Sequence, residues 1–179
     1  MTPTLHGHTD RLSYTEVATP VGDLVLVAGG VALRAVLWPR DDAVRFAARV
    51  GRAAPDHVDG SDHPVLSLAV VQLAEYFDGT RTDFDLPLDP VGTRFQRTAW
   101  EVLRTIPYGS TMTYGEQAAR LGDRGKARAV GAANGRNPLS IVVPCHRVIG
   151  SNGHLTGFGG GLETKAWLLD HERSVLVAS

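Results

Sequence analysis

The chain contains a single cysteine, Cys145, which a histidine and an arginine follow directly in the run NPLSIVVPCHRVIG. A thiol reacts as the thiolate, and an unperturbed cysteine, with a pKa of about 8.5, is mostly protonated at neutral pH. The cationic side chains of His146, Arg147 and the nearby Arg136 could favour the thiolate. These residue types indicate a nucleophile, whereas the competing interpretation is a buried cysteine that serves only as a small apolar side chain.

The backbone around Cys145 limits how the thiol and the imidazole can meet. The apolar run Ile141-Val142-Val143 predicts a buried strand that ends at Cys145. Since neighbouring residues of a strand point to opposite faces, Cys145 and His146 would pair only if the chain turns or a water bridges them. A carboxylate could orient the imidazole, as in nucleophile–base–orienter triads. The candidates on the last predicted helix are Glu163, Asp170 and Glu172.

Composition is that of a globular protein that acts in a reducing compartment. The 179 residues are 43% hydrophobic and 21% charged, and no apolar run approaches the length of a membrane span. The first 14 residues lack the order of a signal peptide, so we expect a cytoplasmic protein without membrane contact. One cysteine excludes an internal disulfide and a multi-thiolate zinc site.

The net charge of −1 hides a strong asymmetry along the chain. Residues 1–90 carry 7 Arg against 13 Asp or Glu, whereas residues 91–150 carry 9 Lys or Arg against 3 Asp or Glu. The two segments therefore have net charges of −6 and +6. The basic segment favours a polyanionic partner such as nucleic acid, with ordinary solvated surface charge as the alternative.

The first half of the sequence predicts a sheet with helices. Alternating apolar residues and the Gly29-Gly30 pair indicate a hairpin, and Pro64 marks the start of a helix that Gly79 stops. The expected elements are strands at 12–18, 23–28 and 31–37, helices within 41–52 and 62–77, and a last strand with a linker at 80–90.

The second half is predominantly helical. Thr113 and Glu116 have the spacing of a capping box, and a four-residue break after that helix gives a helix-turn-helix pattern. The following helix has mostly small residues, which fits either tight packing or close approach to a nucleic acid groove. The expected helices cover 93–103, 113–121, 126–134 and 163–172.

Four motifs in a fixed order carry a resemblance to a known family: GTRFQRTAWEVLRTIPYGSTMTYGEQA, ARAVGAANGRNP, PCHRVIG and GFGGGLETKAWLLDHE. Over residues 92–172 the chain resembles the O6-alkylguanine-DNA alkyltransferases, which repair alkylated DNA. The resemblance implies an α/β (α+β) fold in two domains. These are a ribonuclease-H-like sheet-and-helix domain at 1–90, with a supporting role, and a mostly helical, winged helix-turn-helix-like alkyltransferase domain at 91–179.

The resemblance also implies a role for each matching residue. Cys145 would take the alkyl group from guanine O6 irreversibly, so that one molecule repairs one lesion. Whether O4-alkylthymine is also a substrate is left open. His146 would act through a water, Glu172 would orient it, and Asn137 would tie the third helix to the turn that carries the nucleophile. Tyr114 would assist the leaving guanine at its ring N3. The implied guanine-binding residues are Tyr114, the Cys145 and Val148 carbonyls, Phe158 and Gly159.

The implied partner is double-stranded DNA, bound through its minor groove by a monomer that could bind cooperatively. Arg128 would fill the gap left when the damaged base is flipped out of the stack. The implied DNA-binding residues are Thr113, Lys126, Ala127, Arg128, Ala129, Gly131 and Arg136. No cofactor is implied.

The chain departs from some relatives in two places. Phe158-Gly159 stands where they have Tyr-Ser, so a hydroxyl that could contact guanine O6 is missing. Some relatives also hold a structural zinc with cysteines of the first domain. This chain has only histidines there, at positions 6, 8, 57 and 63, so we expect no metal site.

Three other functions compete with alkyl transfer. A non-catalytic sensor of alkylated DNA would resemble the family but would lack the reactive cysteine. A cysteine hydrolase would use Cys145 and His146 on an acyl substrate and would turn over repeatedly. A transcription factor would bind undamaged DNA with strong sequence selectivity.

Overall fold

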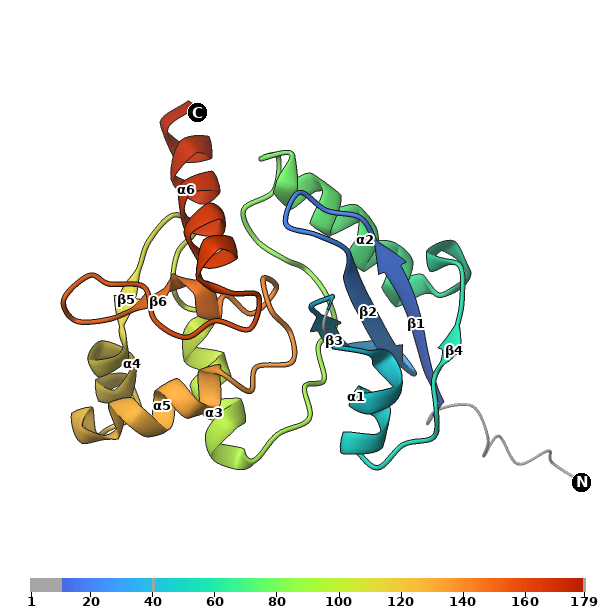
Figure 1. Cartoon of the computed structure of the whole chain (residues 1–179), viewed down its shortest axis with the longest axis horizontal. Coiled ribbons are helices and arrows are strands. Elements are labelled where there is room, and N and C mark those ends of the chain that lie inside the picture. Colours follow the sequence, from blue (N-terminus) through green and yellow to red (C-terminus); the bar gives the residue numbers. More distant parts are fainter. Residues whose placement is uncertain (1–10, 40, 179) are drawn as a thin grey trace, which may run out of the picture.

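The computed structural model describes residues 11–39 and 41–178 and places a four-stranded sheet beside a cluster of helices (Figure 1). The sheet has the order β3-β2-β1-β4, in which β1 is antiparallel to β2, β2 is antiparallel to β3, and β1 is parallel to β4. Its strands are β1 (Leu12–Val17), β2 (Leu24–Gly29), β3 (Ala32–Leu37) and the short β4 (Asp56–His57). The predicted hairpin is therefore confirmed.

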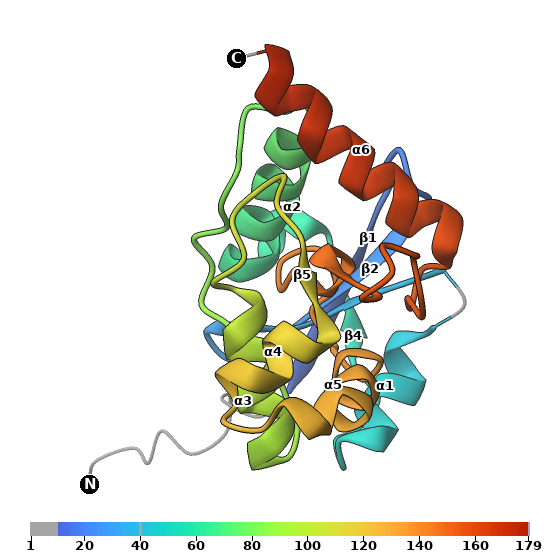
Figure 2. The same cartoon turned by 90° about the vertical axis from the view of Figure 1, so that its left-hand side faces the viewer.

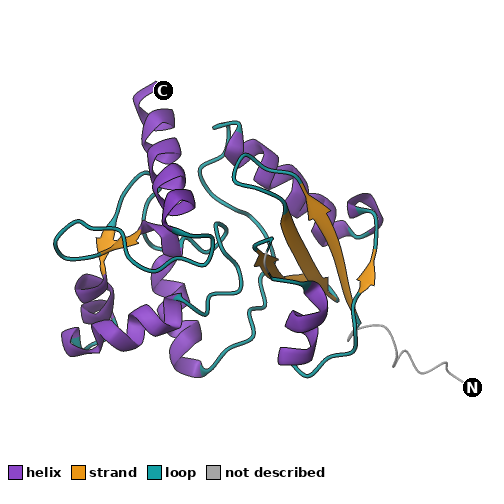
Figure 3. Ribbon diagram, viewed as in Figure 1, coloured by secondary structure: helices purple, strands orange, loops and turns teal. Residues whose placement is uncertain are grey.

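Two helices cover opposite faces of this sheet (Figure 3). Alternate residues of β2 point to opposite faces, so Leu24 and Leu26 pack against α2 (Pro64–Phe77) while Val27 packs toward α1 (Ala43–Arg49). A 3-10 turn, η1 (Gly60–Asp62), leads into α2. The alternating side chains by which the strands were predicted therefore pack into two apolar clusters, one on each face of the sheet.

The last strand predicted for residues 80–90 is wrong. This segment is extended but meets the sheet only at one isolated bridge between Leu33 and Leu88. Leu33 donates to the carbonyl of Pro87 at 2.8 Å and accepts from the Asp89 amide at 3.0 Å. Because proline has no N–H to donate, Pro87 and Pro90 interrupt any longer ladder.

The second half forms the helical cluster, in which α4 and α5 lie against α3 (Figure 2). Thr93 and Thr113 each close a capping box, at α3 and α4 respectively, as their spacing predicts. The last helix ends later than predicted, at Ala178. The elements are α3 (Arg94–Leu103), β5 (Met112–Thr113), α4 (Tyr114–Arg120), η2 (Arg124–Lys126), α5 (Ala127–Asn134), η3 (Cys145–Arg147), β6 (Val148–Ile149) and α6 (Leu162–Ala178). In the described part of the chain, no helix is long and apolar enough to cross a membrane.

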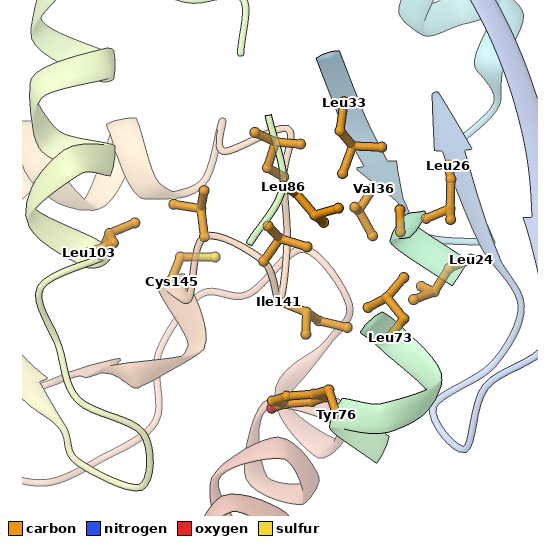
Figure 4. Packing of buried hydrophobic residues seen from close by; sticks show 14 of the residues in the cluster. Leu24, Leu26, Leu33, Val36, Leu73, Tyr76, Leu86, Leu103, Ile141 and Cys145 are labelled. Carbon is orange, nitrogen blue, oxygen red and sulfur yellow. The ribbon is translucent and has the colours of Figure 1, made fainter. Parts of the chain in front are cut away.

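One apolar core joins the two halves. It runs from Leu24 and Leu26 of the sheet through Leu73 and Ile141 to Cys145 (Figure 4). The backbone joins them as well, because the Val36 amide of β3 donates to the carbonyl of Pro138 at 2.8 Å. The segment that leads to the cysteine is therefore attached to the edge of the sheet.

A reciprocal pair of buried amides fixes α4 against α5. Gln117 donates to Asn134 at 3.1 Å and Asn134 donates back at 2.7 Å, while Gln117 also donates to the carbonyl of Ala99 on α3. Both side chains are buried, Gln117 completely. Buried amides cost free energy unless they are paired, so this pair selects one arrangement of the three helices.

We predict that Gln117→Leu lowers the free energy of unfolding by about 2 kcal/mol, because it leaves the Asn134 amide buried without its partner. Urea denaturation of the single variant and of the double variant Gln117→Leu/Asn134→Leu measures this. The double variant should recover part of the loss, since removing both partners removes the unpaired group. Additive losses would contradict the role given to the pair.

Candidate active site

Cys145 lies on a 3-10 turn, and the strand predicted for residues 141–143 is wrong. The chain turns tightly there, with Ile141 at a φ of 72° and the Val143 amide donating to the carbonyl of Leu139 at 2.8 Å. An apolar run that is buried all round has the same pattern in a strand and in a buried turn. Successive side chains of the 3-10 helix point about 120° apart, so Cys145 and His146 still diverge.

Asn137 fixes this turn from one side. Its Nδ2 donates to the carbonyl of Val143 at 2.8 Å, and its Oδ1 accepts from the Leu139 amide at 3.0 Å. Because Asn137 follows α5 by three residues, these bonds join the end of that helix to the segment that carries the cysteine. The geometry agrees with the anchoring role expected for Asn137.

His146 and Glu172 are both completely buried and in contact. The His146 Nε2 lies 2.7 Å from the Glu172 Oε1, and among the described residues its Nδ1 has no hydrogen-bond partner. Burial lowers the pKa of His146, which favours the neutral imidazole. The proton then lies on Nε2, facing the carboxylate, and Nδ1 presents a lone pair that can accept a proton.

The Glu172 carboxylate is surrounded by donors. Arg147 donates from Nε to Oε2 at 2.9 Å and from Nη2 to Oε1 at 3.0 Å, and the Gly109 amide donates to Oε2 at 2.9 Å. The Tyr76 hydroxyl donates to Oε1 at 2.9 Å. Burial alone would raise the pKa of Glu172, but the hydrogen bonds and charges of His146 and Arg147 outweigh it and lower the pKa to about 2. Glu172 is therefore an anion at neutral pH.

The cation beside the thiol is not one of those expected from the sequence. Arg147 turns to Glu172, and Arg136 is exposed and donates to the carbonyl of Ala132. Burial dominates and raises the pKa of the Cys145 thiol above its ordinary value, while a hydrogen bond from the Asn137 side chain and the charge of Lys165 act in the opposite direction. Lys165 is completely buried and donates to the carbonyls of Val148, at 2.6 Å, and Thr156, at 2.8 Å.

Sequence reasoning missed four side chains of this site: Trp38, Tyr76, Arg147 as a partner of Glu172, and Lys165. A signal for Lys165 was present, because Lys165, Leu168, Leu169 and Glu172 form one helical stripe, and all four are buried. Two charges on an apolar stripe indicate a buried polar site. No comparable signal marks the other three, whose partners are distant in the sequence.

Two adjoining cavities reach this site. One, of about 650 Å³, is lined by predicted residues from three segments: Tyr114, Ala127, Arg128, Gly131, Phe158 and Gly159. The other, of about 190 Å³, is lined by Cys145, Asn137 and Trp38 among others. Gly135 and Gly159 line both cavities, so the thiol lies next to the larger one. The Tyr114 hydroxyl donates to the carbonyl of Thr156 at 3.3 Å across the larger cavity's edge.

Trp38 closes the site from the first half of the chain. Its Nε1 donates to the Ser140 hydroxyl at 3.1 Å, and its ring meets Phe158 edge-on with centroids 5.3 Å apart. A Cβ on Gly160 would lie 2.9 Å from the Trp38 ring, and one on Gly159 would lie 3.1 Å from it. The two glycines therefore let the loop at 157–161 rest directly on the indole.

The residues expected to bind DNA differ in exposure and in what they contact. Lys126, Arg128, Ala129 and Arg136 are exposed, while Ala127 and Gly131 line the larger cavity. Thr113 is half-buried, and its hydroxyl is occupied in the capping box of α4. Among the described residues no group of His, Cys, Asp or Glu could hold a metal ion, and His6 and His8 lie outside them.

Comparisons with known proteins cover most of the chain. The DNA-binding domain of 6-O-methylguanine DNA methyltransferase matches residues 94–174, and the ribonuclease-like domain of the same family matches residues 12–90. A methylated-DNA–protein-cysteine methyltransferase from Mycolicibacterium paratuberculosis is 46% identical over 164 residues, 90% of this chain and 93% of that protein. One from Shigella flexneri is 45% identical over 174 residues, 93% of this chain and 99% of that protein.

Solved structures give the same picture. The crystal structure of Mycobacterium tuberculosis OGT in complex with DNA matches with a TM-score of 0.81 at 44% identity, over 91% of this chain and 94% of that one. The predicted mixed α/β fold, with a sheet-and-helix first half and a helical second half, is confirmed.

We predict that the stability supplied by ionised Glu172 is lost in acid. Its folded-state pKa of about 2 lies below the ordinary 4.5, so this contribution is complete above about pH 5 and falls as the pH drops from 4.5 toward 2. The difference in unfolding free energy between the wild type and Glu172→Gln should shrink by about 2 kcal/mol between pH 7 and pH 3. Urea denaturation at several pH values measures it, with Glu163→Gln on the exposed side of α6 as control. If the difference in unfolding free energy between the wild type and Glu172→Gln did not change with pH, Glu172 would not be an ionised, stabilising group in the folded state.

Proposed function

The chain belongs to the 6-O-methylguanine DNA methyltransferase family, and we propose that it repairs O6-alkylguanine in double-stranded DNA by transferring the alkyl group to Cys145. The observation that carries this proposal is the arrangement of the chain's single thiol. It lies beside a buried His146–Glu172 pair and next to a cavity large enough for a nucleobase. The relatives' names, methylated-DNA–protein-cysteine methyltransferase, describe the same reaction class.

The transfer is a single displacement. The Cys145 sulfur attacks the alkyl carbon, the bond from that carbon to guanine O6 breaks, and its electron pair passes to the guanine. The thiol proton moves through one water to the free Nδ1 of neutral His146, and Glu172 stabilises the imidazolium that forms. Guanine leaves as an anion, which the Tyr114 hydroxyl stabilises by donating a hydrogen bond to the ring N3, and solvent then supplies the proton that neutralises the base.

The reaction occurs once per molecule. The product at Cys145 is a thioether, which has no acyl carbon for water to attack, and the site contains no group that would displace the sulfur. Burial raises the pKa of the thiol, so Cys145 rests as the protonated, unreactive form until a substrate is in place. A protein consumed by its first reaction gains from such protection.

The larger cavity is the proposed guanine site. Tyr114 and Phe158 would enclose the ring, the carbonyls of Cys145 and Val148 would accept from the exocyclic amine, and the Gly159 amide would donate to O6. The carbonyl of Val148 already accepts from Lys165, and its second lone pair is available for this bond. Because Gly159 supplies no hydroxyl, only the backbone would contact O6 here.

DNA would bind to the surface that α5 presents. In the proposed complex the thin helix enters the minor groove, where Ala127, Ala129 and Gly131 allow close approach and Arg128 fills the gap that the flipped base leaves in the stack. Lys126 and Arg136 would contact phosphates, and Thr113 contributes by capping the helix that carries Tyr114. We further propose that the protein acts in the cytoplasm as a monomer, with residues 91–179 as the transferring domain and residues 1–90 in support.

We predict that incubation with DNA containing O6-methylguanine adds the mass of one methylene group to the protein, at one equivalent and no more. Intact-protein mass spectrometry measures the gain, which Cys145→Ala should abolish. An unchanged wild-type mass would favour the non-catalytic sensor. Product beyond one equivalent would favour a hydrolase.

We predict that Arg128→Ala slows transfer from duplex DNA at least about tenfold. Flipping the base costs a few kcal/mol of unstacking, and without Arg128 no side chain fills the gap and offsets that cost. Transfer from free O6-benzylguanine, which needs no flipping, should change little. Arg124→Ala removes an exposed charge of the preceding turn that does not line the cavity, and it is the matched control. Equal losses of Arg128→Ala on both substrates would remove the flipping role.

A further inference from the structure

The first half of the chain contributes a side chain to the hydrogen-bond network behind the nucleophile. Tyr76 lies on α2, is completely buried, and donates its hydroxyl proton to the Glu172 Oε1 at 2.9 Å. The two residues are 96 positions apart in the sequence. The carboxylate that orients His146 is therefore completed by a group from outside the domain that carries the cysteine.

Tyr76 is held rigidly in this position. Its ring packs against four aromatic rings, those of Phe77, Phe84, Tyr108 and His171, at centroid distances of 5.3, 5.5, 5.9 and 5.5 Å. The His171 Nε2 lies 2.8 Å from the carbonyl of Tyr76, which ties α6 to α2 one residue before Glu172. Because the phenol ring cannot move, its hydroxyl fixes the position of the Glu172 Oε1 to which it donates.

The contacted oxygen is the one that His146 uses. Oε1 accepts from the Tyr76 hydroxyl and from His146 Nε2, and Arg147 Nη2 lies 3.0 Å from it. Donors that share one carboxylate oxygen compete for its charge. We propose that Tyr76 is a positioning residue of the alkyl transfer: its hydroxyl shares Oε1 with His146 and thereby limits how strongly Glu172 attracts a proton to the imidazole.

This inference rests on the proposed function, in which neutral His146 accepts the thiol proton at Nδ1. Without the Tyr76 hydroxyl, Oε1 would attract the imidazole more strongly and favour the imidazolium, whose Nδ1 cannot accept a proton. Five other titratable or charged groups lie around the pair. They are Cys145 and Arg147 on η3, Lys165 and His171 on α6, and Tyr108 before β5. None of the hydrogen bonds that hold them passes through the Tyr76 hydroxyl.

Tyr76→Phe removes the hydroxyl and keeps the ring, so it tests the bond separately from the packing. Tyr108→Phe is the matched control. Tyr108 is a buried neighbour in the same cluster whose hydroxyl has no hydrogen-bond partner among the described residues. Transfer from O6-methylguanine DNA is followed in single turnover with excess protein between pH 5 and pH 8.5, over the range in which each variant remains folded by circular dichroism.

We expect Tyr76→Phe to transfer at nearly the wild-type rate at pH 8 and progressively more slowly in acid. The half-maximal pH of its acid limb should lie about 0.5 to 1 unit above that of the wild type, whereas Tyr108→Phe should follow the wild type. The His146 ring titration, followed by NMR without DNA, should move upward by a similar amount in Tyr76→Phe alone.

Two results would overturn the inference. One is a Tyr76→Phe profile and a His146 titration that both match the wild type. The other is a loss that is equal at all pH values, with an unmoved His146 titration, which would assign Tyr76 to packing alone. A wild-type protein that transfers no alkyl group at any pH would instead contradict the proposed function, and the NMR titration would still test the bond.

Discussion

The buried carboxylate of Glu172 is the interaction on which the arrangement of the site depends. An ionised carboxylate with no exposed surface is strongly unfavourable unless donors replace the water that it has lost. The donors come from the turn after Cys145, from α2 and from the segment before β5. Each of these segments must be in place for the charge to be tolerated, so the folded state that satisfies Glu172 is the one that places His146 behind the thiol.

A second constraint links the nucleophile to the surface proposed to bind DNA. Asn137 joins the end of α5 to the turn before Cys145, and the buried amides of Gln117 and Asn134 fix α5 against α4. Tyr114 begins α4 and lines the same cavity as Arg128. The groups assigned to flipping, holding and dealkylating the base therefore share one rigid frame, in which a shift of α5 would move the thiol as well.

Local signals predicted much of this structure, and long-range contacts account for what they missed. The capping boxes at Thr93 and Thr113 begin helices where the spacing of side chains indicates. Periodicity failed at Ile141, because a buried apolar turn and a buried strand carry the same pattern. The pairing of Glu172 with His146 was expected, but two other partners of Glu172 were beyond the reach of pattern reasoning, since Tyr76 and Gly109 lie 96 and 63 positions away and carry no local mark of their role.

The glycine at position 159 has a physical explanation in the first half of the chain. Trp38 lies beneath the loop at 157–161, and a Cβ on Gly159 would lie 3.1 Å from its ring, closer than an ordinary contact, while one on Gly160 would lie 2.9 Å from it. A loop that rests on this indole therefore favours glycine at both positions. Trp38, which Ser140 orients, and Gly159 of the loop thus both line the cavity next to the thiol. Together with the Tyr76 hydroxyl on Glu172, this places side chains from the first half of the chain at the boundary of the site.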